Sequence, residues 1–111
     1  MPRFVILRHE LSPGHDRDSH FDLMLEVSGA LRTWSLPKLP AAGKVIRAEP
    51  LPDHRLAYLD YEGSISGNRG SVSRVEEGEY EVVEETGGLL RVHLAGKNLR
   101  GILELRQAEN S

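Results

Sequence analysis

Hydrophobic and polar residues alternate with a period of two along most of this chain. In the stretch HFDLMLEV at positions 20–27, every second residue from Phe21 onward is apolar, and the positions between them are polar except for Met24. Successive side chains of a β-strand point to opposite faces, so this pattern predicts a half-buried strand. Ser28 and Gly29 follow as a turn.

The same pattern recurs between turns that are rich in Gly, Pro, Asp and Ser. The expected strands are 4–7, 20–27, 30–36, 44–48, 54–62, 71–75, 80–84, 89–94 and 99–105. Pro50 and Pro52 are expected to break the pattern before 54–62, and no segment has convincing helical periodicity. We therefore expect an all-β fold, a compact antiparallel β-barrel of about eight short strands with little helix, formed by residues 1–111 as a single domain.

Composition restricts the chemistry that this chain can carry. Its 111 residues are 39% hydrophobic and 28% charged, which is ordinary for a globular protein, and no apolar run approaches the ~20 residues that span a bilayer. The absence of cysteine excludes thiolate ligands and disulfides and fits the cytoplasm. A net charge of −3 disfavours a long electrostatic grip on duplex DNA, so a nucleic-acid ligand would be contacted locally.

One polar strand face offers metal ligands. His20 and Asp22 lie two residues apart, so both side chains point to the same face, and His9 follows the first expected strand. Imidazole and carboxylate suit manganese, iron or zinc. From the residues alone a solvated strand face is the simpler interpretation, and His15 and Asp16 in the intervening loop are rival ligands.

A second cluster lies in PDHRLAYLDYEG, where His54 and Tyr58 would share one face of a strand. A histidine and a tyrosine together can donate hydrogen bonds to a phosphate oxygen. The simpler interpretation is again a surface histidine beside a half-buried tyrosine.

These pieces occur together and in order in a known family. RHE (8–10), HFDLMLE (20–26), GALRTWSLPK (29–38), DHRLAYLDYEG (53–63) and LAGKNLRG (94–101) resemble the 3′-phosphoesterase module of bacterial ATP-dependent DNA ligase D, over nearly the whole chain. The resemblance implies a β-barrel with a divalent metal in a groove at one end. The metal is Mn²⁺ by preference, or another transition metal such as Zn²⁺.

Residue roles follow from the same resemblance. It implies that the metal is held by His9, His20 and Asp22, that the phosphate is engaged by His54 and Tyr58, and that Lys38 lies near the groove. The implied enzyme is a metal-dependent phosphoesterase. It removes a 3′ ribonucleoside and then the 3′ phosphate from DNA or RNA–DNA ends, and a separate ligase or polymerase is a further expected partner.

Met24 departs from the family pattern, which has an arginine there. A thioether cannot replace a bidentate contact to phosphate. The basic residues available to compensate are Arg17, Arg47, Arg55 and Arg69. Two alternatives to the phosphoesterase therefore stay open: a catalytically diverged metal-binding relative that binds a DNA end or a ligase or polymerase, and an enzyme for a smaller phosphoester such as a nucleotide.

Three further features have plain structural interpretations. Trp34 is expected in the core or a groove wall, and His93 on the surface. A solvated acidic face is expected of Glu76, Glu77, Glu79, Glu81, Glu84 and Glu85.

Overall fold

A computed structural model describes residues 2–10, 20–64 and 70–107 of the chain. Nine strands form one sheet, with one short 3₁₀ turn: β1 (Arg3–Glu10), β2 (His20–Val27), β3 (Ala30–Leu36), β4 (Val45–Arg47), β5 (Glu49–His54), η1 (Leu56–Leu59), β6 (Gly63–Ser64), β7 (Ser71–Thr86), β8 (Leu89–Gly96) and β9 (Arg100–Arg106). The all-β prediction is confirmed. In these ranges no helix is long and apolar enough to cross a membrane.

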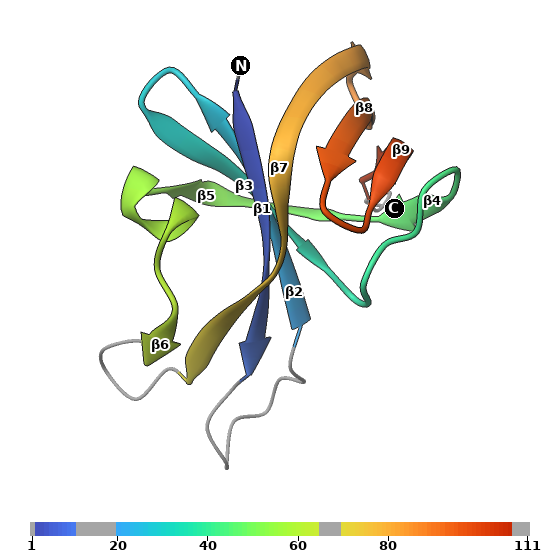
Figure 1. The fold of residues 1–111 in the computed structure, drawn as a ribbon. Helices are drawn as coiled ribbons and strands as arrows, with labels where there is room; N and C mark the ends of the chain where they lie inside the picture. The colour runs from blue at the N-terminus through green and yellow to red at the C-terminus, as the bar shows by residue number, and fades with distance from the viewer. Residues whose placement is uncertain (1, 11–19, 65–69, 108–111) are drawn as a thin grey trace.

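The sheet is not closed into a barrel, which corrects that part of the expectation. Its strands run in the order β4-β9-β8-β7-β1-β2-β3-β5, with β6 paired to β7, and β1 lies at the centre between β7 and β2 (Figure 1). The chain passes from the β4 edge to the β5 edge through Ala48, whose N–H donates to the carbonyl of Arg106 at 2.9 Å. Only β4 and β9 pair in parallel among the strands described, so the sheet is also not purely antiparallel.

Two hydrophobic clusters lie on opposite faces of the central strands. The larger contains Phe4, Ile6, Leu23, Leu25, Trp34, Leu36, Ile46, Ala48, Tyr80, Leu90, Val92, Leu94, Leu103 and Leu105. The smaller, here called the site-face cluster, contains Val5, Leu7, Met24, Leu31, Leu59 and Val72, with Tyr58 packed against it. Because residues alternate between faces along β1 and β2, these strands contribute to both clusters.

The segment 54–62 is not the expected strand. Strand β5 instead includes Pro50 and Pro52 and ends at His54, after which the chain turns through η1. Proline lacks an N–H donor, so it is tolerated in a strand where no neighbour needs that donor. As β5 is an edge of the sheet, paired only with β3, the prolines fit there and the chain is free to turn away afterwards.

The expected strands 71–75 and 80–84 are two parts of one strand, the 16-residue β7. Figure 1 shows it as the long curved strand that passes β1 and continues to β8. Gly78 lies at its middle, where a Cβ would stand 2.1 Å from the carbonyl oxygen of Ala95. Glycine here therefore allows close approach of β8 rather than ending the strand.

A β-bulge in β7 turns Glu76 into the protein. Pairing with β1 shifts register between Ile6 and Leu7, opposite Glu76 and Arg74. The extra residue reverses the alternation, so Glu76 joins the face of Ile6 instead of solvent. Its side chain is only 5% exposed, which contradicts its assignment to a solvated acidic face. Exposure is retained by Glu79, Glu81, Glu84 and Glu85, while Glu77 is half-buried.

The Glu76 carboxylate organises the turn between β8 and β9. It accepts backbone N–H bonds from Lys97 (2.8 Å), Asn98 (2.9 Å) and Leu99 (2.5 Å), and a fourth from Glu77 (3.0 Å). Burial by itself would raise the pKa of Glu76, but the four N–H donors outweigh it and hold the pKa below its ordinary value of 4.5. The carboxylate therefore stays charged and serves as the centre of the turn.

Replacing Glu76 by glutamine tests this role. Glu76→Gln places an amide N–H₂ among N–H donors, and we expect the free energy of unfolding to fall by about 2–4 kcal/mol at pH 7. Because the folded pKa is lowered, the wild-type advantage is full above pH 4.5 and disappears as the pH falls through the folded pKa. Urea unfolding of both proteins between pH 3 and pH 7 measures it. Glu81→Gln, on the exposed side of β7, is the control and should leave stability unchanged. An equal loss from both substitutions would contradict the assignment.

Candidate metal centre

The antiparallel pairing of β1 with β2 brings two histidines and an aspartate to one end of the sheet. His9 lies directly opposite His20, and Leu7 lies opposite Asp22. Cross-strand partners point to the same face, as do residues two apart in one strand. All three polar side chains therefore project from the face that carries the site-face cluster.

These three side chains are close enough to share one ion. A ligand atom from each of His9, His20 and Asp22 lies within 4.8 Å of the others. Asp22 Oδ1 is 3.1 Å from His20 Nε2, and Asp22 Oδ2 is 3.6 Å from His9 Nδ1. The two imidazole rings are tilted by 58° with their centroids 4.8 Å apart. Within the described ranges no other group of His, Asp and Glu is arranged in this way.

The environment of Asp22 fits a cation. Its residue is only 4% exposed, and its ion-pair partners among the described residues are the two imidazoles, not a lysine or arginine. Oδ1 is buried and accepts no hydrogen bond from the described residues. A buried carboxylate requires a pairing charge or a metal. Two nitrogen donors and one oxygen donor form a set suited to manganese, iron or zinc.

Met24 lies two residues from Asp22 on the same face, but its side chain does not reach solvent. It is 1% exposed and packs in the site-face cluster with Leu7 and Leu31. The position at which the family pattern has an arginine therefore carries a buried apolar side chain beside the triad. Burial of a methionine of this kind contributes about 1.5–3 kcal/mol to stability.

His54 and Tyr58 form a second group on this face. Their rings meet edge to face with centroids 5.6 Å apart, and Tyr58 packs against the site-face cluster. His54 pairs with Leu31, which lies opposite Glu26, six residues along β2 from His20. His54 Nδ1–H donates to the carbonyl oxygen of Pro52 at 3.0 Å. A carbonyl can only accept, so in the neutral imidazole Nδ1 carries the proton and Nε2 is an acceptor; protonation makes Nε2 a donor.

The remaining predicted residues are scattered. Lys38 is exposed two residues beyond Leu36, which pairs with Phe21, so it lies at the end of the sheet where β2 begins. Arg47 and Arg55 are exposed and lie outside the triad. The rival ligands His15 and Asp16, and two of the compensating arginines, Arg17 and Arg69, fall outside the residues that the structure describes. Trp34 is buried and His93 is exposed, as expected.

Sequence reasoning missed Arg74, which anchors the segment that carries Tyr58. Arg74 pairs with Leu7 across β7 and β1 and therefore lies on the site face. Its guanidinium donates to the carbonyl of Leu59 at 3.1 Å and contacts Glu77 at 2.5 Å and Glu62 at 3.6 Å. Its backbone N–H also donates to Glu62 at 2.9 Å. Arg74 thus ties η1 and the residues after it to β7, but no pattern in SVSRVEE indicates this.

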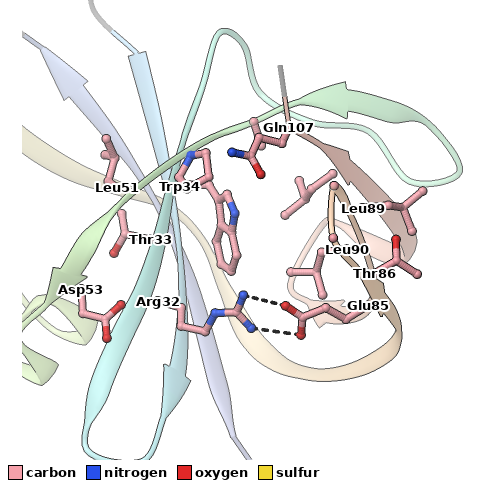
Figure 2. A pocket seen from close by; sticks show the side chains of 15 residues that line it. Arg32, Thr33, Trp34, Leu51, Asp53, Glu85, Thr86, Leu89, Leu90 and Gln107 are labelled. Carbon is pink, nitrogen blue, oxygen red and sulfur yellow. Dashed lines mark hydrogen bonds and ion pairs between the residues drawn. The ribbon is translucent and has the colours of Figure 1, made fainter. Parts of the chain in front are cut away.

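A pocket of about 170 Å³ opens between β3, β5 and the β7–β8 hairpin, and it contains none of the triad. Figure 2 shows Trp34 within it, and Arg32 paired with Glu85 through two hydrogen bonds of 2.9 and 3.2 Å. The Arg32 guanidinium lies 4.8 Å from the centroid of the Trp34 ring. The side-chain hydrogen bonds raise the pKa of Arg32 and lower that of Glu85, so the pair stays ionised and joins β3 to the hairpin.

Comparison with known proteins points to one family. Residues 13–107 match the model of the DNA ligase D 3′-phosphoesterase domain. This range includes His20, Asp22, His54 and Tyr58 but not His9, which the structure brings to the other two ligands of the triad.

Two curated relatives are similar over part of their length. The chain is 32% identical over 108 residues, 88% of its length, to the multifunctional non-homologous end joining DNA repair protein LigD of Mycobacterium tuberculosis. It is 35% identical over 65 residues, 57% of its length, to the multifunctional non-homologous end joining protein LigD of Pseudomonas aeruginosa. It covers only 13% and 7% of these two proteins, respectively.

Removing the Arg74 guanidinium should loosen the segment that carries Tyr58. Arg74→Met keeps the aliphatic stem but loses the bond to Leu59 and both carboxylate contacts, and we expect the free energy of unfolding to fall by about 1–2 kcal/mol. Denaturant unfolding measures this. Arg91→Met is the matched control, because Arg91 also contacts two glutamates, Glu84 and Glu104, but donates to no backbone carbonyl among the described residues. Its loss should be smaller; the reverse order would contradict the anchoring role.

Proposed function

Because the chain belongs to the DNA ligase D 3′-phosphoesterase domain family, we propose that it is a metal-dependent phosphoesterase that acts on the 3′ ends of DNA. Family membership supports a role in DNA end processing during repair. The observation that carries the finer proposal is the convergence of His9, His20 and Asp22 within 4.8 Å, on the face of the sheet that also carries His54 and Tyr58. The proposed reaction removes a 3′ ribonucleoside and then the 3′ phosphate, and leaves a 3′ hydroxyl.

The triad would hold one divalent cation, for which Mn²⁺ is the first candidate and Zn²⁺ the second. When bound, the ion supplies Lewis-acid polarisation of a phosphate oxygen and offsets the negative charge that develops there. Leu7 and Met24 pack beneath the triad and keep β1 and β2 in register. Rigid support of this kind holds the ligands in the geometry that a metal requires.

Tyr58 and His54 would bind the phosphate through hydrogen bonds. They lie on the same face as the triad, where Tyr58 packs against the site-face cluster. No described residue accepts a hydrogen bond from the Tyr58 hydroxyl, which leaves it available to a phosphate oxygen. The bond from His54 Nδ1–H to Pro52 orients the ring so that Nε2 faces away from that carbonyl. In the protonated imidazole Nε2 can donate to the phosphate or to the departing oxygen, and the neutral form can accept a proton.

The proposed substrates are DNA or RNA–DNA 3′ ends, and the proposed place of action is the cytoplasm. With a net charge of −3, contact at an end rather than along a duplex is consistent with the chain's electrostatics. A separate ligase or polymerase would use the 3′ hydroxyl and is the proposed partner.

One observation favours a second function. Met24 is fully buried where the family pattern has an arginine, so one guanidinium contact to phosphate is missing from the site face. Such a loss costs about 10²–10³ in rate by analogy with oxyanion donors. The alternative is a diverged relative that binds a metal and a DNA end, or a ligase or polymerase partner, without turnover.

Metal binding tests the triad without reference to activity. We expect the wild-type protein to bind Mn²⁺, measured by loss of the free-ion electron paramagnetic resonance signal, and His20→Ala or Asp22→Ala to weaken this binding at least tenfold. His93→Ala, which removes an exposed histidine of β8, is the control and should bind as the wild type does. Equal binding by all four proteins would exclude the triad as the metal site.

The phosphate-binding group is tested by turnover. With Mn²⁺ and two labelled primer–templates, one with a 3′ phosphate and one with a single 3′ ribonucleotide, the wild type should produce 3′ hydroxyl ends. Tyr58→Phe and His54→Ala should bind Mn²⁺ normally but lose about 10²–10³ in rate, because each removes a phosphate contact. His20→Ala is the control for contaminating phosphatase. No conversion by a wild type that binds Mn²⁺ would support the non-catalytic relative.

A further inference from the structure

We propose that Tyr61 is the stacking platform for the base of the terminal nucleotide. This inference rests on the proposed function only in taking a nucleic-acid end as the ligand. Tyr61 follows η1, and its side chain is partly open to solvent, with 39% of the residue exposed. Aromatic faces bind nucleobases by stacking without sequence preference, since every base offers a π-face.

Strand register places Tyr61 at the end of the sheet that carries the triad. His20 pairs with His9, His9 pairs with Val72, and Val72 pairs with Gly63. These four residues form one row across β2, β1, β7 and β6. Two strand spacings, about 10 Å, therefore separate the backbones of His9 and Gly63. A Cβ built on Gly63 would lie 3.4 Å from the hydroxyl oxygen of Tyr61, so the phenol ring reaches this same row.

Neighbouring groups hold the Tyr61 ring in a fixed orientation. Its hydroxyl donates to the carbonyl oxygen of Ser64, in β6. Its ring meets the ring of Tyr58 edge to face, with centroids 5.8 Å apart and an interplanar angle of 81°. Tyr58 in turn meets His54 at 5.6 Å. Tyr61 keeps 39% of its surface exposed beside these contacts, so part of the residue remains accessible while its position is set at little further entropic cost.

The triad, Tyr58 and Tyr61 are arranged on this face in the order expected for contacts to the phosphate and then the base of one nucleotide. The triad and the Tyr58 hydroxyl would engage the phosphate, and Tyr61 adjoins Tyr58 on the side away from His54 in the chain of rings. A base extends from its 3′ phosphate by a distance similar to the two strand spacings between His9 and Gly63. The geometry thus fits a DNA end whose last base leaves the helical stack and lies on Tyr61. The contact with the tyrosine ring would offset the stacking energy that the base loses.

Binding of a normal and an abasic end separates stacking from phosphate contact. Fluorescence anisotropy would measure the dissociation constant, in Mn²⁺, of two primer–templates with a 3′ phosphate, of which one lacks the terminal base. For the end with the base we expect Tyr61→Ala to bind about 5- to 100-fold more weakly than the wild type. For the abasic end the two proteins should bind alike. Tyr61→Phe keeps the ring and should resemble the wild type, whereas Tyr61→Leu keeps bulk and should resemble Tyr61→Ala.

The controls distinguish the possible failures. Val83→Ala trims another exposed side chain, on β7, and should change neither constant. Thermal unfolding of each variant checks folding. If Tyr61→Ala weakens both ends equally, Tyr61 acts through Tyr58 or the fold, and the stacking role is overturned. It is also overturned if the wild type binds both ends alike or neither. A wild type that prefers the end with the base but releases no phosphate leaves stacking intact and refutes the hydrolytic function.

Discussion

The register between β1 and β2 is the constraint on which the site depends. With His9 opposite His20, both imidazoles and the Asp22 carboxylate project from one face, and a shift of one residue would send either strand's side chains to the other face. The register is held from both sides of the sheet. Ile6 and Leu23 are buried in the larger cluster, while Leu7 and Met24 are buried in the site-face cluster. A slip of one residue in β2 would exchange Leu23 and Met24 between the two clusters and turn Asp22 toward the larger one. Packing on two faces therefore determines the position of three polar groups.

The fold could be predicted from the sequence where a local period sufficed. Strands β2, β3 and β8 lie where the sequence alternation places them, although only β8 has a single buried face and the centres of β2 and β3 are buried on both faces. The prediction failed where tertiary context decides. Pro50 and Pro52 are compatible with β5 only because that strand is an edge. Gly78 continues β7 because β8 comes close to it, and closure of the sheet depends on whether β4 and β5 pair, which no local pattern encodes.

Part of the candidate site could also be predicted from the sequence. The spacing of His20 and Asp22 on an alternating strand predicts a shared face, and the family resemblance adds His9, which the structure brings to the same point. Glu76 and Arg74 could not be found in this way. Burial of Glu76 requires the bulge in β7, and the contact of Arg74 with Leu59 requires the turn at η1. Both are long-range events, and the chain shows only glutamates and an arginine in a polar strand.

The separation of the two clusters has a consequence for how such a domain can evolve. The larger cluster joins most of the strands, and it lies on the face away from the triad. Substitutions among the few site-face residues, of which Met24 is one, perturb a small apolar layer and leave the main core intact. Catalytic side chains can thus be gained, lost or exchanged without a collapse of the architecture, and selection for new chemistry can act on one surface of the sheet while the other preserves foldability.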